Sequence, residues 1–128
     1  MNTQSHLFQS QLDMNHYLYK SANETLLAIM NRRGWTVRVF TKHTMLPPNY
    51  YHRLKKGALF RLRTYTTIGV ALGLTSDHLR NILHVSGKSY NLHSREEAAF
   101  IFILDRFPHS LPEANAFLES EGLPPLTT

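Results

Sequence analysis

The chain has 128 residues, a net charge of +5 and no cysteine, which fits one domain with a modest core and excludes a disulfide framework and thiolate metal sites. The first 19 residues lack the charged start and apolar run of a signal peptide, and the longest apolar run, seven residues at 98–104, is far short of the roughly 20 that span a membrane. We therefore expect a cytoplasmic protein with no membrane partner.

Start and stop signals predict helices along nearly the whole chain, so the expected fold class is all-α. Residues 9–20 have a weak helical pattern. The helices expected after them cover, in chain order, residues 22–33, 37–43, 47–56, 63–72, 76–86, 94–107 and 111–121.

The ends of these helices are predicted from caps, prolines and glycines. Pro47 and Pro48 are expected to begin the third of them, since the first N–H groups of a helix have no intrahelical partner, and Gly57 ends it. Ser94 and Glu97 form a capping-box pattern. The other expected caps are Ser21 or Asn23, Thr36, and Thr75 or Ser76.

Charge is unevenly distributed along the chain. The segment from Thr25 to Ser76 contains nine lysines and arginines and no acidic residue. The segment from Ser94 to Thr128 reverses the balance, with six acids and two bases. This asymmetry predicts a polyanion site in the middle of the chain and a solvated or partner-facing tail.

The apolar run at residues 98–104 covers nearly every face of a helix. Such a helix is either buried within the domain or shared with a partner. The sequence leaves both alternatives open.

One long segment, from Gly34 to Leu83, reads GWTVRVFTKHTMLPPNYYHRLKKG, five loop residues, and RTYTTIGVALGLTSDHLRNIL. It resembles the lambda-repressor-like helix-turn-helix, also called the Cro or xenobiotic-response-element family. The resemblance depends on Leu54 before Gly57 and on the ALG triplet at 71–73. It also depends on Leu79 and the Ile82–Leu83 pair in the helix expected at 76–86. It implies a five-helix DNA-binding domain at residues 22–87, preceded by a segment at 1–21 and followed by a two-helix extension at 88–128.

The resemblance also implies which side chains meet DNA. The base-reading positions of the recognition helix correspond to Pro48, Asn49 and Arg53, with His52 adjacent. Arginine can grip guanine, and asparagine adenine, through two hydrogen bonds. Tyr51 is expected to face the core, which leaves Tyr50 near the groove. The side chains expected to contact phosphates are Arg38, Lys42, Tyr50, Lys55, Lys56, Arg61 and Arg63.

Two positions depart from the family pattern. Met45 stands in the turn where glycine is usual, and Thr41 stands where alanine is usual. These departures imply an altered angle between the two helices of the motif.

The function expected from these observations is sequence-specific binding of double-stranded DNA by a bacterial or mobile-element transcriptional regulator. Members of this motif class bind palindromic sites as dimers, so a homodimer is expected. The alternative is an antitoxin or protein-interaction module that uses its acidic, apolar tail. The acid-free basic segment favours DNA.

The sequence offers no pattern of an enzyme or metalloprotein. Eight histidines are scattered without paired ligand spacing, and no nucleophile elbow, phosphate-binding loop or dinucleotide glycine motif is present. We expect no catalytic activity, no metal and no cofactor.

Overall fold

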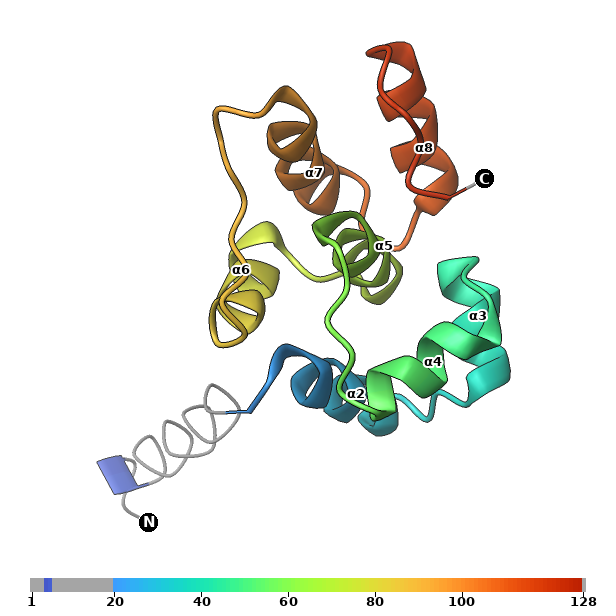
Figure 1. The fold of residues 1–128 in the computed structure, drawn as a ribbon, viewed down its shortest axis with the longest axis vertical. Coiled ribbons are helices and arrows are strands. Elements are labelled where there is room, and N and C mark those ends of the chain that lie inside the picture. The colour runs from blue at the N-terminus through green and yellow to red at the C-terminus, as the bar shows by residue number, and fades with distance from the viewer. Residues whose placement is uncertain (1–3, 6–19, 128) are drawn as a thin grey trace.

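The computed structural model describes residues 4–5 and 20–127, and this part of the chain contains helices and no strands (Figure 1). The expected all-α class is therefore confirmed for the described residues. The helices are α2 (Ala22–Arg32), α3 (Val37–Thr44), α4 (Pro48–Lys55), α5 (Leu62–Leu72), α6 (Ser76–His84), α7 (Arg95–Arg106) and α8 (Leu111–Ser120). The helical pattern expected at 9–20 lies outside the described residues.

The alternatives for the helix caps are resolved by hydrogen bonds. Ser21 caps α2, because its hydroxyl accepts from the Glu24 N–H, whereas Asn23 is buried. Thr75 caps α6 in the same way. Ser94 accepts from the Glu97 N–H as predicted, but the Glu97 carboxylate accepts from a loop N–H four residues upstream of α7 rather than from its own cap. The pairing of a capping box is therefore only half formed.

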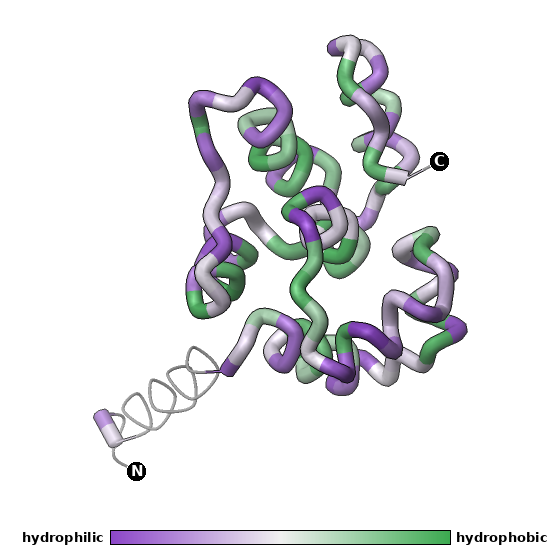
Figure 2. Tube along the Cα trace, in the orientation of Figure 1, coloured by the Kyte–Doolittle hydropathy of each residue, from purple (hydrophilic) through white to green (hydrophobic). Residues whose placement is uncertain are grey.

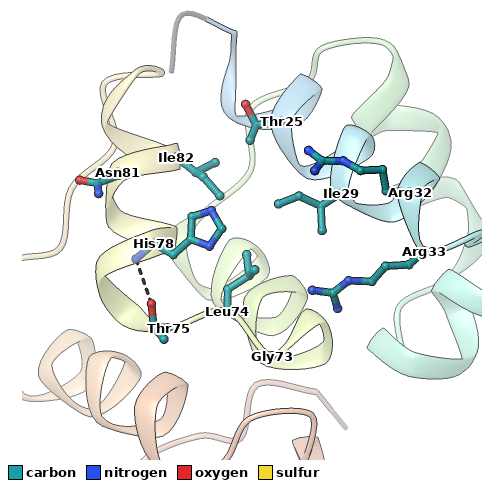
Figure 3. Close-up of a pocket in the computed structure, with 10 residues that line it drawn as sticks. All are labelled: Thr25, Ile29, Arg32, Arg33, Gly73, Leu74, Thr75, His78, Asn81 and Ile82. Carbon is teal, nitrogen blue, oxygen red and sulfur yellow. Dashed lines mark hydrogen bonds between the residues drawn. The ribbon is translucent and has the colours of Figure 1, made fainter. Parts of the chain in front are cut away.

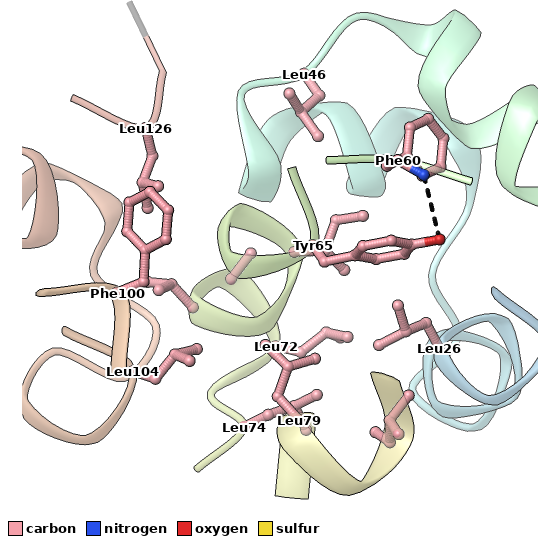
Figure 4. Close-up of a cluster of buried hydrophobic side chains, with 14 of the residues drawn as sticks. Leu26, Leu46, Phe60, Tyr65, Leu72, Leu74, Leu79, Phe100, Leu104 and Leu126 are labelled. Atoms are coloured by element: carbon pink, nitrogen blue, oxygen red, sulfur yellow. Dashed lines mark hydrogen bonds between the residues drawn. The ribbon is translucent and has the colours of Figure 1, made fainter. Parts of the chain in front are cut away.

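Helix α5 is the centre of the molecule and packs against α3, α7 and α8 (Figure 1). Every residue from Thr64 to Leu72 is buried. Figure 4 shows its Tyr65 and Leu72 between Leu26 of α2 and Phe100 of α7. One cluster of buried side chains thus includes both the segment at 22–87 and the segment at 88–128.

The apolar run of α7 packs mainly inside the molecule. Phe100, Ile103 and Leu104 are at most 2% exposed, and α7 contacts α5, α6 and α8. Phe102 is the exception at 46% exposure, and its ring lies 4.7 Å from that of Phe117 on α8. Intramolecular burial therefore accounts for most of the run, and Phe102 is the part of it left at the surface.

The last residues fold back onto the body of the protein. The Asn115 amide donates to Thr127, and its oxygen accepts from the Leu126 N–H at 2.8 Å. Leu126 is 7% exposed, and the Thr127 hydroxyl lies 3.7 Å from the sulfur of Met45. The tail therefore connects α8 to the turn between α3 and α4.

Membrane insertion has no support in the described residues, since none of their helices combines the length and the apolarity that a bilayer-spanning segment requires.

Candidate nucleic-acid interface

Helices α3 and α4 are joined by a tight turn centred on Met45. This residue has φ 61°, in the left-handed region, and its N–H donates to the Thr41 carbonyl. A glycine would adopt this conformation without the steric strain of a side chain. Met45 nevertheless adopts it. One helical turn earlier, the buried Thr41 hydroxyl has no hydrogen-bond partner among the described residues.

The inner side of α4 is fixed by one aromatic and one aliphatic side chain. Tyr51 is 5% exposed and its ring lies 5.5 Å from that of Phe40 on α3, while Leu54 is 1% exposed. The expected inward orientation of Tyr51 is thus what the structure has. Tyr50 is half-buried and lies against Phe60 in the following loop.

The outer side of α4 presents polar side chains to solvent. Asn49, His52, Arg53 and Lys56 are all exposed, and so is Pro48 in the first turn. Figure 2 shows mostly hydrophilic residues along α4, in contrast to the apolar stretches of α5 and α7. The residues expected to read bases therefore share one accessible face.

Arg53 is held by two aromatic rings. The rings of Tyr50 and Phe60 are stacked with centroids 5.6 Å apart. The Arg53 guanidinium carbon lies 4.9 Å from the Phe60 centroid and 5.3 Å from the Tyr50 centroid. Contacts of this kind restrict the rotamers of an arginine while leaving its N–H groups available. The sequence analysis did not identify Phe60 as part of this site.

Five cations, on α3, at the end of α4 and in the loop after it, are candidates for phosphate contact. They are all exposed: Arg38, Lys42, Lys55, Lys56 and Arg61. Lys55 has its ammonium 5.0 Å from the Tyr51 ring. Between described residues the structure has two ion pairs, Arg63–Glu96 and Arg95–Glu121. None of the five is thus neutralised by a carboxylate of the described chain.

Arg63 differs from these five cations because it makes several contacts within the protein. Its guanidinium donates to the Pro125 and Pro124 carbonyls, pairs with Glu96 at 3.2 Å and lies over the Phe100 ring. The side chain is only 20% exposed. We expected it to contact phosphate, but its position in the first turn of α5 faces it toward α7 and the tail. We therefore leave Arg63 out of the phosphate-binding set proposed below.

The end of α4 is held by a buried polar network that no local sequence pattern indicates. The Asn23 amide donates to the Ala58 carbonyl at 2.6 Å and to the Leu54 carbonyl at 3.4 Å. The Tyr65 hydroxyl donates to the Asn23 oxygen at 2.7 Å and accepts from the Phe60 N–H. Burial raises the pKa of Tyr65, partly opposed by the Phe60 N–H. This network connects α2 and α5 to the loop that follows α4.

The described residues contain no group of three histidine, aspartate or glutamate side chains placed to hold a metal ion. Comparisons of the chain with protein-family models, with curated proteins and with solved structures found no significant match.

Proposed function

We propose that this chain is a sequence-specific double-stranded DNA-binding protein, acting as a transcriptional regulator, and that α2–α6 form a lambda-repressor-like helix-turn-helix domain extended by α7 and α8. The observation that carries the proposal is the exposed face of α4. It presents Asn49, His52 and Arg53 beside exposed cations, in a segment without one acidic residue. An acidic groove-facing residue would repel phosphate, and none is present there.

The contacts divide into two kinds. Pro48, Asn49, His52 and Arg53 on α4 enter the major groove, where Arg53 can bond guanine and Asn49 adenine. The flanking side chains bind phosphates and set affinity without sequence choice. They are Arg38, Lys42, Tyr50, Lys55, Lys56 and Arg61.

A dimer on a palindromic site follows from the same proposal, because one recognition helix reads only a half-site. The surface that we assign to pairing is the aromatic cluster of Phe102, Phe107 and Phe117, whose ring centroids lie 4.7–6.3 Å apart. Sedimentation at micromolar concentration should give a species of twice the 14.8 kDa monomer mass. A monomer throughout would contradict pairing in solution.

The alternative function is an antitoxin or protein-interaction module, and the exposure of Phe102 is the observation that favours it. In that case the aromatic cluster would hold another protein rather than a second copy. A protein of this kind does not need to keep acids out of α3 and α4.

Selection of bound sites from a pool of random duplexes tests DNA binding and symmetry together. The expected result is enrichment of a palindrome, with affinity for it falling steeply as salt rises. Recovery of random sequences with no common site would contradict sequence-specific binding. A single, non-repeated half-site would contradict the symmetric dimer and leave base reading intact.

A further inference from the structure

A cleft of about 800 Å³ lies between α2 and α6 (Figure 3). Its lining includes none of the side chains that we assign to DNA. The residues around it are Thr25, Ile29, Arg32, Arg33, Gly73, Leu74, Thr75, His78, Asn81 and Ile82. Pockets that bind small molecules have volumes of about 300–1,000 Å³, so the cleft is of a suitable size.

One part of the cleft is apolar. Ile29 of α2 and Ile82 of α6 approach from opposite walls, and Leu74 lies between them (Figure 3). Leu74 and Ile82 are 4% and 5% exposed and therefore well fixed in the core. Such a surface accepts a hydrocarbon group and excludes water from it.

The other part of the cleft is cationic. The Arg33 guanidinium is oriented by a hydrogen bond to the Leu72 carbonyl, and the planar group has further N–H donors. The His78 ring lies inside the cleft near Leu74 (Figure 3). Burial first, and the charge of Arg33 second, lower the pKa of His78, so the imidazole is neutral near pH 7. None of the described residues that line the cleft is acidic.

We propose that this cleft binds a small amphipathic anion, a carboxylate carried on an apolar group. The carboxylate lies at Arg33, within reach of the His78 ring, and the apolar group lies on Ile29, Leu74 and Ile82. A nucleic acid phosphate would gain nothing from the apolar wall, and an uncharged hydrocarbon would leave the guanidinium unused. The apolar wall and the Arg33 guanidinium together therefore favour a ligand that carries both an apolar group and a negative charge.

Calorimetric titration of the full chain with octanoate tests the proposal, with acetate and octylammonium as probes that lack the apolar chain or reverse the charge. Octanoate should bind saturably and with higher affinity than either. Arg33→Gln, which keeps a hydrogen-bond donor, should weaken octanoate binding by about tenfold. Arg80→Gln removes an exposed arginine of α6 that does not line the cleft, and it should bind as the wild type does.

A second variant keeps the test decisive if Arg33→Gln does not fold. Ile29→Trp should cover the apolar wall formed by Leu74 and Ile82 and weaken octanoate binding strongly, while far-ultraviolet circular dichroism stays unchanged. The proposal is overturned if octanoate shows no saturable binding, if octylammonium binds equally well, or if both cleft variants bind octanoate as the wild type does. None of these outcomes depends on DNA binding, so the two proposals fail or stand separately.

Discussion

Arg53 is the single side chain on which base reading depends most. Its guanidinium rests against Tyr50 and Phe60, so little rotamer freedom remains to be lost on binding. Arg53→Ala should weaken binding to the selected site by about 1–3 kcal/mol and relax the preference at one base position. Competition between the selected duplex and single-base variants measures both effects.

The matched control for this change is Lys42→Ala, which removes an exposed cation of α3. It should weaken all duplexes alike and lower the slope of log affinity against log salt by about one. Equal losses on specific and random DNA for Arg53→Ala would falsify its base-reading role.

Asn23 is the residue whose loss should loosen α4 most without touching its outer face. Asn23→Ala removes the partner of the Ala58 carbonyl and of the Tyr65 hydroxyl. A buried group left unsatisfied destabilises a protein by about 1–3 kcal/mol, so urea unfolding should show a loss of this size. Asn31→Ala changes an exposed asparagine of the same helix and should have a much smaller effect. Similar losses for both would mean that the network contributes little.

At the scale of elements, two arginines close together in sequence have different tasks. Arg63 connects the start of α5 to Glu96 and to the carbonyls of the tail, whereas Arg61 is exposed. Arg63→Gln should lower the free energy of unfolding and leave the salt slope of DNA binding unchanged. Arg61→Gln should reduce the slope of log DNA affinity against log salt by about one and change the free energy of unfolding little. A lower salt slope for Arg63→Gln would restore it to the phosphate-binding set.

Helices α5, α6 and α7 approach one another closely at Gly69. A Cβ added there would lie 2.7 Å from a methyl of Leu79 and 3.0 Å from a methyl of Leu104. Both leucines are at most 1% exposed, so neither can move toward solvent. Gly69→Ala should therefore destabilise the protein by about 1–2 kcal/mol, even though alanine favours a helix by about 1 kcal/mol.

A double-mutant cycle isolates the cause of this loss. Leu79→Val makes room beside Gly69, so combining the two changes should destabilise less than the sum of the single changes. Strict additivity would show that the crowding is not between these two residues.

At the scale of the whole molecule, the cleft makes stability depend on pH. The pKa of His78 is lowered from 6.5 in the folded protein, chiefly by burial and then by the nearby Arg33, with Arg32 also at the cleft. Below pH 6.5 the unfolded chain therefore binds more protons than the folded one. This contribution to stability is present above pH 6.5 and is lost as the pH falls through the window between 6.5 and the lower folded-state value.

Urea unfolding between about pH 5 and 7 measures this dependence. The free energy of unfolding should rise with pH more steeply in the wild type than in His78→Gln. His84→Gln is the matched control for the loss of a histidine from α6. An unchanged slope in His78→Gln would show that His78 titrates alike in the folded and unfolded states.

Helix α2 relates the two proposed sites. Its first turn carries Asn23, which holds the loop after α4, and its end carries Arg33 in the cleft. A ligand that shifts α2 would therefore act on the support of α4.

Local sequence signals predict the helices between residues 22 and 120 and, to within two residues, where they end. Caps, prolines and glycines act through neighbouring backbone groups, so Ser94, Pro48 and Gly57 carry their information locally. The spacing of Asn49 and Arg53 likewise predicts the outer side of α4. Spacing alone allows either Tyr50 or Tyr51 beside Leu54 on the inner side, and the burial of Tyr51 in the structure decides between them.

Contacts between residues far apart in the sequence depend on how the helices pack. Asn23 could serve as a cap or as a core residue, and the hydroxyl of Tyr65, 42 residues away, settles which. Arg63 was assigned to phosphate from its charge and position, but the tail that engages it is about 60 residues downstream. The cleft between α2 and α6 likewise exists only once the helices pack. Caps, prolines and glycines act on the backbone hydrogen bonds of their own segment, so they can be read from the sequence. Contacts between distant segments depend on the packing of the helices, which these local signals do not specify.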